Sequence, residues 1–151
     1  MDLYHLIYVS RATVPVDNEV LARIKTAAST HNPRSGITGL LLYSRGHFIQ
    51  LLEGPRSAIT NLYDHICVDN RHADVELLLL TPVSERFYPS WAMGVYDLES
   101  FSDQMDVEAL ANVIAAKQSE EKVDHVSVVN IFESFRHLVA GSGQPEPTAT
   151  P

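Results

Sequence analysis

Residues 37–52, ITGLLLYSRGHFIQLL, form the stretch of sequence that decides the fold. Two nearly apolar runs of strand length flank the segment 44–47, which contains a glycine, and this succession is the signature of a β-hairpin. Because both runs are apolar at consecutive positions, both faces of the two strands should be buried. The stretch therefore predicts a β-sheet that is covered on both sides.

Gln50 is the polar exception inside the second run. Its amide carries two N–H donors and an oxygen that can accept two hydrogen bonds. Leaving such a group buried and unpaired costs about 1–3 kcal/mol. Its partners are either groups of the protein and buried water, or a bound polar ring, and this residue alone leaves both open.

The elements around the hairpin follow from periodicity and from helix signals. A strand is predicted over residues 3–10, where side chains of alternating positions face opposite sides of the sheet. A helix should follow with Asp17 as its N-cap, and it should stop at or before Asn32 because Pro33 disfavours helical geometry in the preceding residue. Beyond the hairpin we expect a helix over 55–68, a strand over 75–83 and a short last strand over 91–96.

This order, β-α-β-β-α-β-β, begins with the six elements of a ferredoxin-like fold. We therefore expect an α+β domain over residues 1–97, with its two helices on one face of the sheet. Residues 98–140 should add two amphipathic helices that cover the other face, because apolar side chains recur there at helical spacing. Residues 141–151 have the composition of a disordered tail.

Composition and charge exclude several classes of protein. With 45% apolar and 20% charged residues, the 151-residue chain is typical of a soluble globular protein. A net charge of −8 disfavours direct binding to nucleic acid or to an anionic membrane. A single cysteine, Cys67, provides no disulfide framework, and the histidines lack the spacing of a zinc site. With neither a membrane-spanning run nor a signal peptide, we expect a cytoplasmic protein.

Counting along the strands brings polar side chains to one face. Phe48, Gln50 and Leu52 share a face of their strand, and Tyr8 and Ser10 share a face of the first strand. The first and third strands are adjacent and central in a ferredoxin-like sheet, so Tyr8 and Gln50 can be neighbours. With Asn32 at the end of the first helix, these groups would suit a planar heteroaromatic ligand, although polar groups that are satisfied separately remain an alternative.

The chain contains the segments LYHLIYVS (3–10), HNPRSGITGLL (31–41) and FIQLLEG (48–54). Together they closely resemble the BLUF family of blue-light-sensing flavin domains. The segments DNRH (69–72) and WAM (91–93) also fall where that family has related motifs. The resemblance covers roughly residues 1–97, and the rest looks like the short, stand-alone members of the family. It implies a non-enzymatic photoreceptor that binds FAD, or alternatively FMN or riboflavin. It also implies signalling to a separate protein partner, and we expect a homo-oligomer.

The resemblance also assigns roles to individual residues. Tyr8 would donate an electron and a proton under light, Gln50 would be the switching amide, and Asn32 would hold the polar edge of the flavin ring. Trp91 and Met93, on the last strand, would relay the change. The remaining residues expected at the flavin are Ser10, Ile24, His31, Leu41, Phe48, Ile66, Arg71 and His72.

Two other functions are compatible with the same fold. A small acyl-phosphate hydrolase would require a phosphate-binding loop after the first strand, but residues 10–15 (SRATVP) contain one arginine and no glycine. A flavin-free interaction module would retain the fold and bind only a protein. The colour of the purified protein separates both from a flavin photoreceptor.

Overall fold

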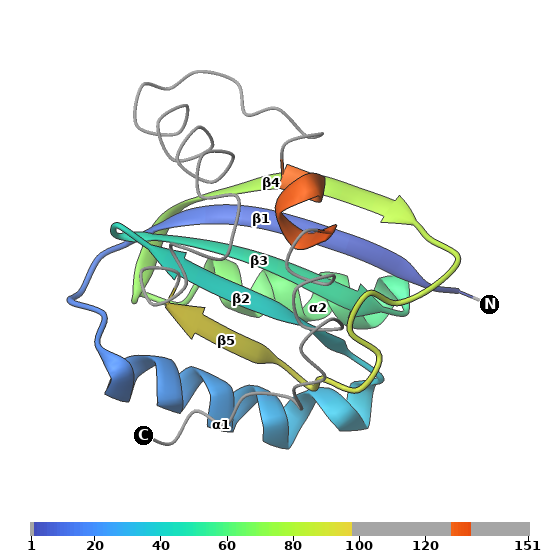
Figure 1. Ribbon diagram of the computed structural model, residues 1–151, viewed down its shortest axis with the longest axis horizontal. Coiled ribbons are helices and arrows are strands. Elements are labelled where there is room, and N and C mark those ends of the chain that lie inside the picture. The colour runs from blue at the N-terminus through green and yellow to red at the C-terminus, as the bar shows by residue number, and fades with distance from the viewer. Residues whose placement is uncertain (1, 98–127, 134–151) are drawn as a thin grey trace. The chain divides into compact units, whose positions relative to one another are not determined.

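The computed structural model describes residues 2–97 and 128–133. Within residues 2–97 the order of elements is the predicted one (Figure 1). The sheet has the strand order β4-β1-β3-β2-β5, so β1 and β3 are central and adjacent, as expected for the ferredoxin-like α+β class. The elements are β1 (Tyr4–Ala12), α1 (Asn18–Ser35), β2 (Thr38–Ser44), β3 (His47–Gly54), α2 (Arg56–Cys67), β4 (His72–Pro82) and β5 (Gly94–Asp97).

The predicted hairpin is formed by β2 and β3. Arg45 and Gly46 at its turn both have positive φ, 50° and 82°. A two-residue type I′ turn requires positive φ at both of its central residues. The resulting register places Gln50 opposite Leu41 on β2 and opposite Tyr8 on β1. Gln50 therefore lies in the central strand of the sheet with Tyr8 as its direct neighbour, which confirms the pairing expected from face counting.

Helix α1 begins as predicted and ends later than predicted. The Asp17 carboxylate accepts a hydrogen bond from the Val20 N–H at 3.0 Å, which confirms the N-cap. The expected stop at Asn32 was wrong, because α1 continues to Ser35 with Pro33 inside it. A proline so close to the C-terminus removes only one backbone hydrogen bond of the helix. The helix ends instead at Gly36, whose φ of 70° suits a left-handed cap.

Segment 128–133 is helical, in agreement with the predicted second C-terminal helix. Its apolar side chains Val128, Ile131 and Phe132 are buried. The other predicted C-terminal helix, the tail 141–151 and the covering of the second sheet face lie outside the described residues. In the described part of the chain, no helix is both long enough and apolar enough to cross a membrane.

The connection from β4 to β5 is tied to the sheet through Glu53, which is fully buried at the end of β3. Its carboxylate accepts hydrogen bonds from His5 Nε2 at 2.7 Å and from the backbone N–H groups of Phe87 and Tyr88. Burial by itself would raise the pKa of Glu53, but these hydrogen bonds together hold it below its usual value. Glu53 therefore anchors, as a carboxylate, the segment that leads to Met93.

We expect Glu53→Gln to lower the free energy of unfolding by about 2–3 kcal/mol at pH 7, because the amide loses charge-assisted hydrogen bonds in a buried position. Because the pKa of Glu53 is lower in the folded protein than its ordinary value of 4.5, its carboxylate stabilises the wild type at pH values above 4.5. This stabilisation is lost as the pH falls through the lower pKa of the folded state. The variant should lose this part of the acid sensitivity. Urea unfolding of both proteins at pH 7 and pH 4 measures the effect, and equal stability at pH 7 would contradict it.

Candidate functional site

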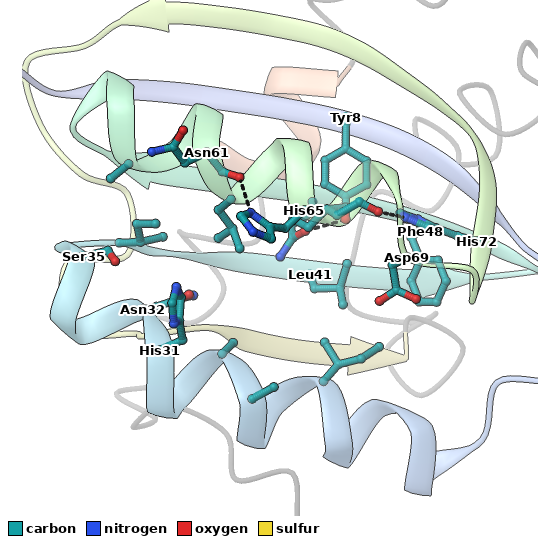
Figure 2. A pocket seen from close by; sticks show the side chains of 18 of the residues that line it. Tyr8, His31, Asn32, Ser35, Leu41, Phe48, Asn61, His65, Asp69 and His72 are labelled. Atoms are coloured by element: carbon teal, nitrogen blue, oxygen red, sulfur yellow. Dashed lines mark hydrogen bonds between the residues drawn. The ribbon is translucent and has the colours of Figure 1, made fainter.

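A cavity of about 790 Å³ lies between α1 and α2 above the sheet (Figure 2). This volume is within the usual range of small-molecule sites. Both helices contribute side chains at helical spacing, and the floor is formed by residues of β1, β2 and β3. The cavity therefore lies over the sheet face that carries Tyr8 and Gln50.

All but one of the residues expected at a flavin line this cavity. They are Tyr8, Ile24, His31, Asn32, Leu41, Phe48, Gln50, Ile66, Arg71 and His72. Ser10 is not among the lining residues. It is fully buried on β1, and its hydroxyl lies 2.7 Å from His72 Nδ1.

The contact between Ser10 and His72 has a defined direction. His72 Nε2 lies 2.6 Å from the Ile66 carbonyl oxygen, which can only accept a hydrogen bond. In the neutral imidazole the proton is therefore on Nε2, and the Ser10 hydroxyl donates to Nδ1. Ser10 was expected in the cavity wall. It lies instead behind the wall, where it orients His72, which does line the cavity.

Several lining residues were not predicted from the sequence. For those on the helices the signal was helical spacing, because they follow Ile24 on α1 or surround Ile66 on α2 at intervals of three or four residues. These are Ala27, Ala28, Ser35, Ala58, Asn61, Leu62 and His65. The other two, Ile37 and Asp69, lie in the connections that follow α1 and α2.

Tyr8, Gln50 and Met93 form a continuous chain of contacts beside the cavity. The Tyr8 hydroxyl donates to Gln50 Oε1 at 2.5 Å, and Gln50 Nε2 donates to the Met93 sulfur at 3.3 Å. Burial is the main cause that raises the pKa of Tyr8 well above its ordinary value of 10.0. The phenol is therefore protonated at neutral pH, with its proton directed at the amide oxygen.

Trp91 and Met93 were both expected on the last strand, but β5 begins only at Gly94. Pairing of β5 with β2 starts there, opposite Leu40. Met93 is buried and contacts Gln50, whereas Trp91 stacks on Tyr88 with ring centroids 5.4 Å apart. Neither side chain lines the cavity, and it is the Met93 sulfur that accepts the hydrogen bond from Gln50.

One end of the cavity carries a pair of opposite charges. Arg71 donates through Nη2 to Asp69 Oδ2 at 2.6 Å, and the two side chains are about one third exposed, at 40% and 31%. The hydrogen bonds from Arg71 are the main cause that lowers the pKa of Asp69. This pair suits the hydroxyl or phosphate groups of a ligand chain that leaves the cavity.

The donors in the cavity suit a flat ring with carbonyl groups. Every buried side-chain nitrogen and oxygen in the described residues has a hydrogen-bond partner, so the fold needs no ligand to satisfy them. Asn32 and Gln50 nevertheless each carry two amide hydrogens, and each donates one hydrogen bond within the protein, to the Ala92 carbonyl and to the Met93 sulfur. Apolar walls from Ile24 and Ile66 flank these amides. Among residues 2–97 and 128–133, no three histidine, cysteine or acidic side chains cluster as metal ligands would.

Comparison with known proteins gives a consistent family. Residues 3–94 match the BLUF model, described as sensors of blue light using FAD. The photoactivated adenylate cyclase subunit beta-like protein FB of Euglena gracilis is 37% identical over 141 residues, which are 91% of this chain and 16% of that protein. The photoactivated adenylate cyclase subunit beta of the same organism is 44% identical over 89 residues, 58% of this chain and 10% of that protein. The chain thus spans only 10–16% of the length of these curated relatives.

Solved structures agree with the sequence comparison. The dark-state structure of BlrB, a BLUF protein, superposes with a TM-score of 0.70 at 29% identity, over 93% of this chain and 97% of BlrB. A bacterial light-regulated adenylyl cyclase also has a TM-score of 0.70, at 32% identity, over 78% of this chain and 35% of the cyclase.

Proposed function

Because the chain belongs to the BLUF family of sensors of blue light using FAD, we propose that it binds FAD in the cavity between α1 and α2 and senses light through the Tyr8–Gln50 pair. The observation that carries this proposal is the chain of contacts from the Tyr8 phenol through the Gln50 amide to the Met93 sulfur. It connects a protonated phenol at the cavity to the segment that precedes the last strand.

The residues of the cavity fit the isoalloxazine ring of FAD. Ile24 and Ile66 would pack on the ring faces, and Leu41 and Phe48 would complete the apolar surroundings. Asn32 and Gln50 would donate their remaining amide hydrogens to the carbonyl groups of the ring. His31, Arg71 and His72 would lie at the ring edge and along the side chain of the cofactor. FMN and riboflavin carry the same ring and should also fit.

The bound flavin supplies absorption of blue light and, once excited, a strong oxidant. Tyr8 would be the donor, and a phenol that loses an electron becomes a strong acid. Its proton already points to Gln50 Oε1 at 2.5 Å, so electron loss and proton transfer to the amide can occur together. When electron and proton return to Tyr8, Gln50 can remain rotated or tautomerised, with a different group directed at the cavity.

A rearranged Gln50 would also give up its bond to the Met93 sulfur. The start of β5 would then be released, and light would shift an equilibrium between two arrangements of this segment. We propose that residues 1–97 form this sensor without a catalytic role and that residues 98–140 transmit its state. The output would be a protein partner or a second copy of the chain, since a charge of −8 favours neither nucleic acid nor an anionic membrane.

A light-minus-dark absorption spectrum of the purified chain tests the proposed function. We expect yellow protein with bound FAD and a small red shift of the blue absorption band that reverses in darkness. Ala28→Trp is the matched control, because the larger side chain would fill the cavity from α1 and should give colourless protein. Colourless wild-type protein after expression with ample flavin, or a spectrum unchanged by light, would contradict the proposal.

A further inference from the structure

Two side chains of α1 hold the backbone just before β5. Lys25 Nζ donates to the Met93 carbonyl oxygen at 2.6 Å, and Asn32 Nδ2 donates to the Ala92 carbonyl oxygen at 2.9 Å. The two residues are seven positions apart, which is two helical turns, so they project from the same face of α1. The helix that walls the cavity is thereby tied directly to the segment that carries the Met93 sulfur.

The burial of Lys25 is unusual for its residue type. The residue is 8% exposed. Lysine is almost never buried unless its ammonium group is paired. An apolar residue would fill the same place beside Leu21 and Ala28 without that desolvation cost. Since Lys25 does not line the cavity, its place is explained by what its amine holds, and the Met93 carbonyl is such a partner.

The backbone of Met93 must be held in place for its sulfur to accept the hydrogen bond from Gln50 at one defined position. Methionine has a flexible side chain, and sulfur is a weak acceptor. The contact of 3.3 Å between the sulfur and Gln50 Nε2 therefore cannot by itself position the segment. The ladder between β2 and β5 begins only at Gly94. Residues 91–93 are instead held through their carbonyl groups, which accept from the Gly39 N–H, Asn32 and Lys25 in turn.

We propose that Lys25 is a positioning residue that fixes the Met93 backbone so that its sulfur lies on the Gln50 amide in darkness. The inference rests on the proposed function, and it adds a residue through which α1 controls how fast the light-adapted state returns to the dark state. Asn32 acts on the neighbouring carbonyl but also lines the cavity. Lys25 is therefore the residue that can be changed without touching the flavin.

Lys25→Met removes the amine and keeps a side chain of similar length. We expect FAD to bind with an unchanged dark spectrum. Dark recovery should slow about three- to tenfold, the rate equivalent of losing the hydrogen bond to the Met93 carbonyl, because the loosened backbone must be ordered before the sulfur regains Gln50. Lys25→Arg should restore the rate. Arg23→Met, which changes an exposed residue of the same helix, should not alter it.

Two further measurements separate positioning from a general loss of packing. In a Met93→Leu background, Lys25→Met should have no further effect on recovery, because the sulfur through which Lys25 acts is absent. Methionine labelled with ¹³C at its carbonyl marks only residues 1, 93 and 105. The Met93 carbonyl band in the light-minus-dark infrared spectrum should shift to higher frequency in Lys25→Met, because this carbonyl loses the hydrogen bond from Lys25. If Lys25→Met does not fold, Lys25→Gln takes its place in both experiments. The Gln amide nitrogen is one bond closer to the helix than Lys25 Nζ, so it should not reach the Met93 carbonyl and the expectations are the same.

The outcomes distinguish this inference from the proposed function. A wild-type chain that shows no light response would overturn the function and the inference together. A normal wild-type response with unchanged recovery and an unchanged carbonyl band in Lys25→Met would overturn the role of Lys25 alone. Additive effects of Lys25→Met and Met93→Leu would also overturn it, because they would show that Lys25 does not act through Met93.

Discussion

Replacing Tyr8 with Phe is expected to leave FAD bound and to abolish the reversible red shift. The ring of Phe preserves packing in the core cluster around Leu6 and Leu52, and the cavity walls are unchanged. The variant lacks the hydroxyl that gives up a proton to Gln50 Oε1, so electron loss can no longer be coupled to proton transfer. Light-minus-dark absorption spectra measured at equal flavin occupancy test this expectation.

Tyr63→Phe is the matched control for this experiment. The Tyr63 ring lies 5.8 Å from the Tyr8 ring, so it is a second phenol close to the first. Burial is the main cause that raises its pKa to about 12, so both phenols are protonated at neutral pH and protonation does not distinguish them. It is Tyr8 that donates to Gln50. The control should retain the red shift, and a normal photocycle in Tyr8→Phe would remove Tyr8 as the donor.

Gln50→Leu is expected to bind FAD and to fail to form the signalling state. Leucine has a similar size, so packing against Leu41 and the Tyr8 ring should persist. The buried Tyr8 hydroxyl loses its acceptor, which should lower the free energy of unfolding by about 1–3 kcal/mol. The Met93 sulfur also loses its donor, so the light reaction has neither a proton acceptor nor a route to the last strand. Absorption spectra and urea unfolding measure the two effects.

Asn61→Leu makes the same chemical change elsewhere in the cavity wall and serves as its control. Asn61 lies on α2, and its backbone carbonyl, which accepts a hydrogen bond from His65, is unaffected by the substitution. This variant should show the full red shift. A fully reversible shift of normal size in Gln50→Leu would rule out the amide as the switch.

The pairing of Tyr8 with Gln50 could be predicted from the sequence because it depends on two strong regularities. Side chains alternate along a strand, and the ferredoxin-like order makes β1 and β3 neighbours. The predicted end of α1 was wrong because the rule that residues before proline avoid helical geometry is only a tendency. The left-handed cap at Gly36 outweighs it. Local sequence rules do not contain that balance.

Lys25 and Glu53 could not be identified as anchors from their own positions in the sequence. A lysine in an amphipathic helix normally indicates the solvent-exposed face, and a glutamate before Gly-Pro normally indicates a turn. Each becomes an anchor only through a partner distant in the sequence, 68 residues away for the Lys25–Met93 pair and 34 for Glu53–Phe87. The same reason explains why the separate places of Trp91 and Met93 were not predicted.

The orientation of the Gln50 amide also limits how often the protein can signal in darkness. Its oxygen accepts from the Tyr8 hydroxyl and its nitrogen donates to the Met93 sulfur, so a half-turn of the rigid amide breaks both of these hydrogen bonds at once. If the two losses together cost about 3 kcal/mol, fewer than roughly one molecule in a hundred would hold the turned amide without light. The short hydrogen bond from Tyr8 thus limits the fraction of the proposed receptor that signals in darkness. Weakening it would raise this dark signalling before it impaired the response to light.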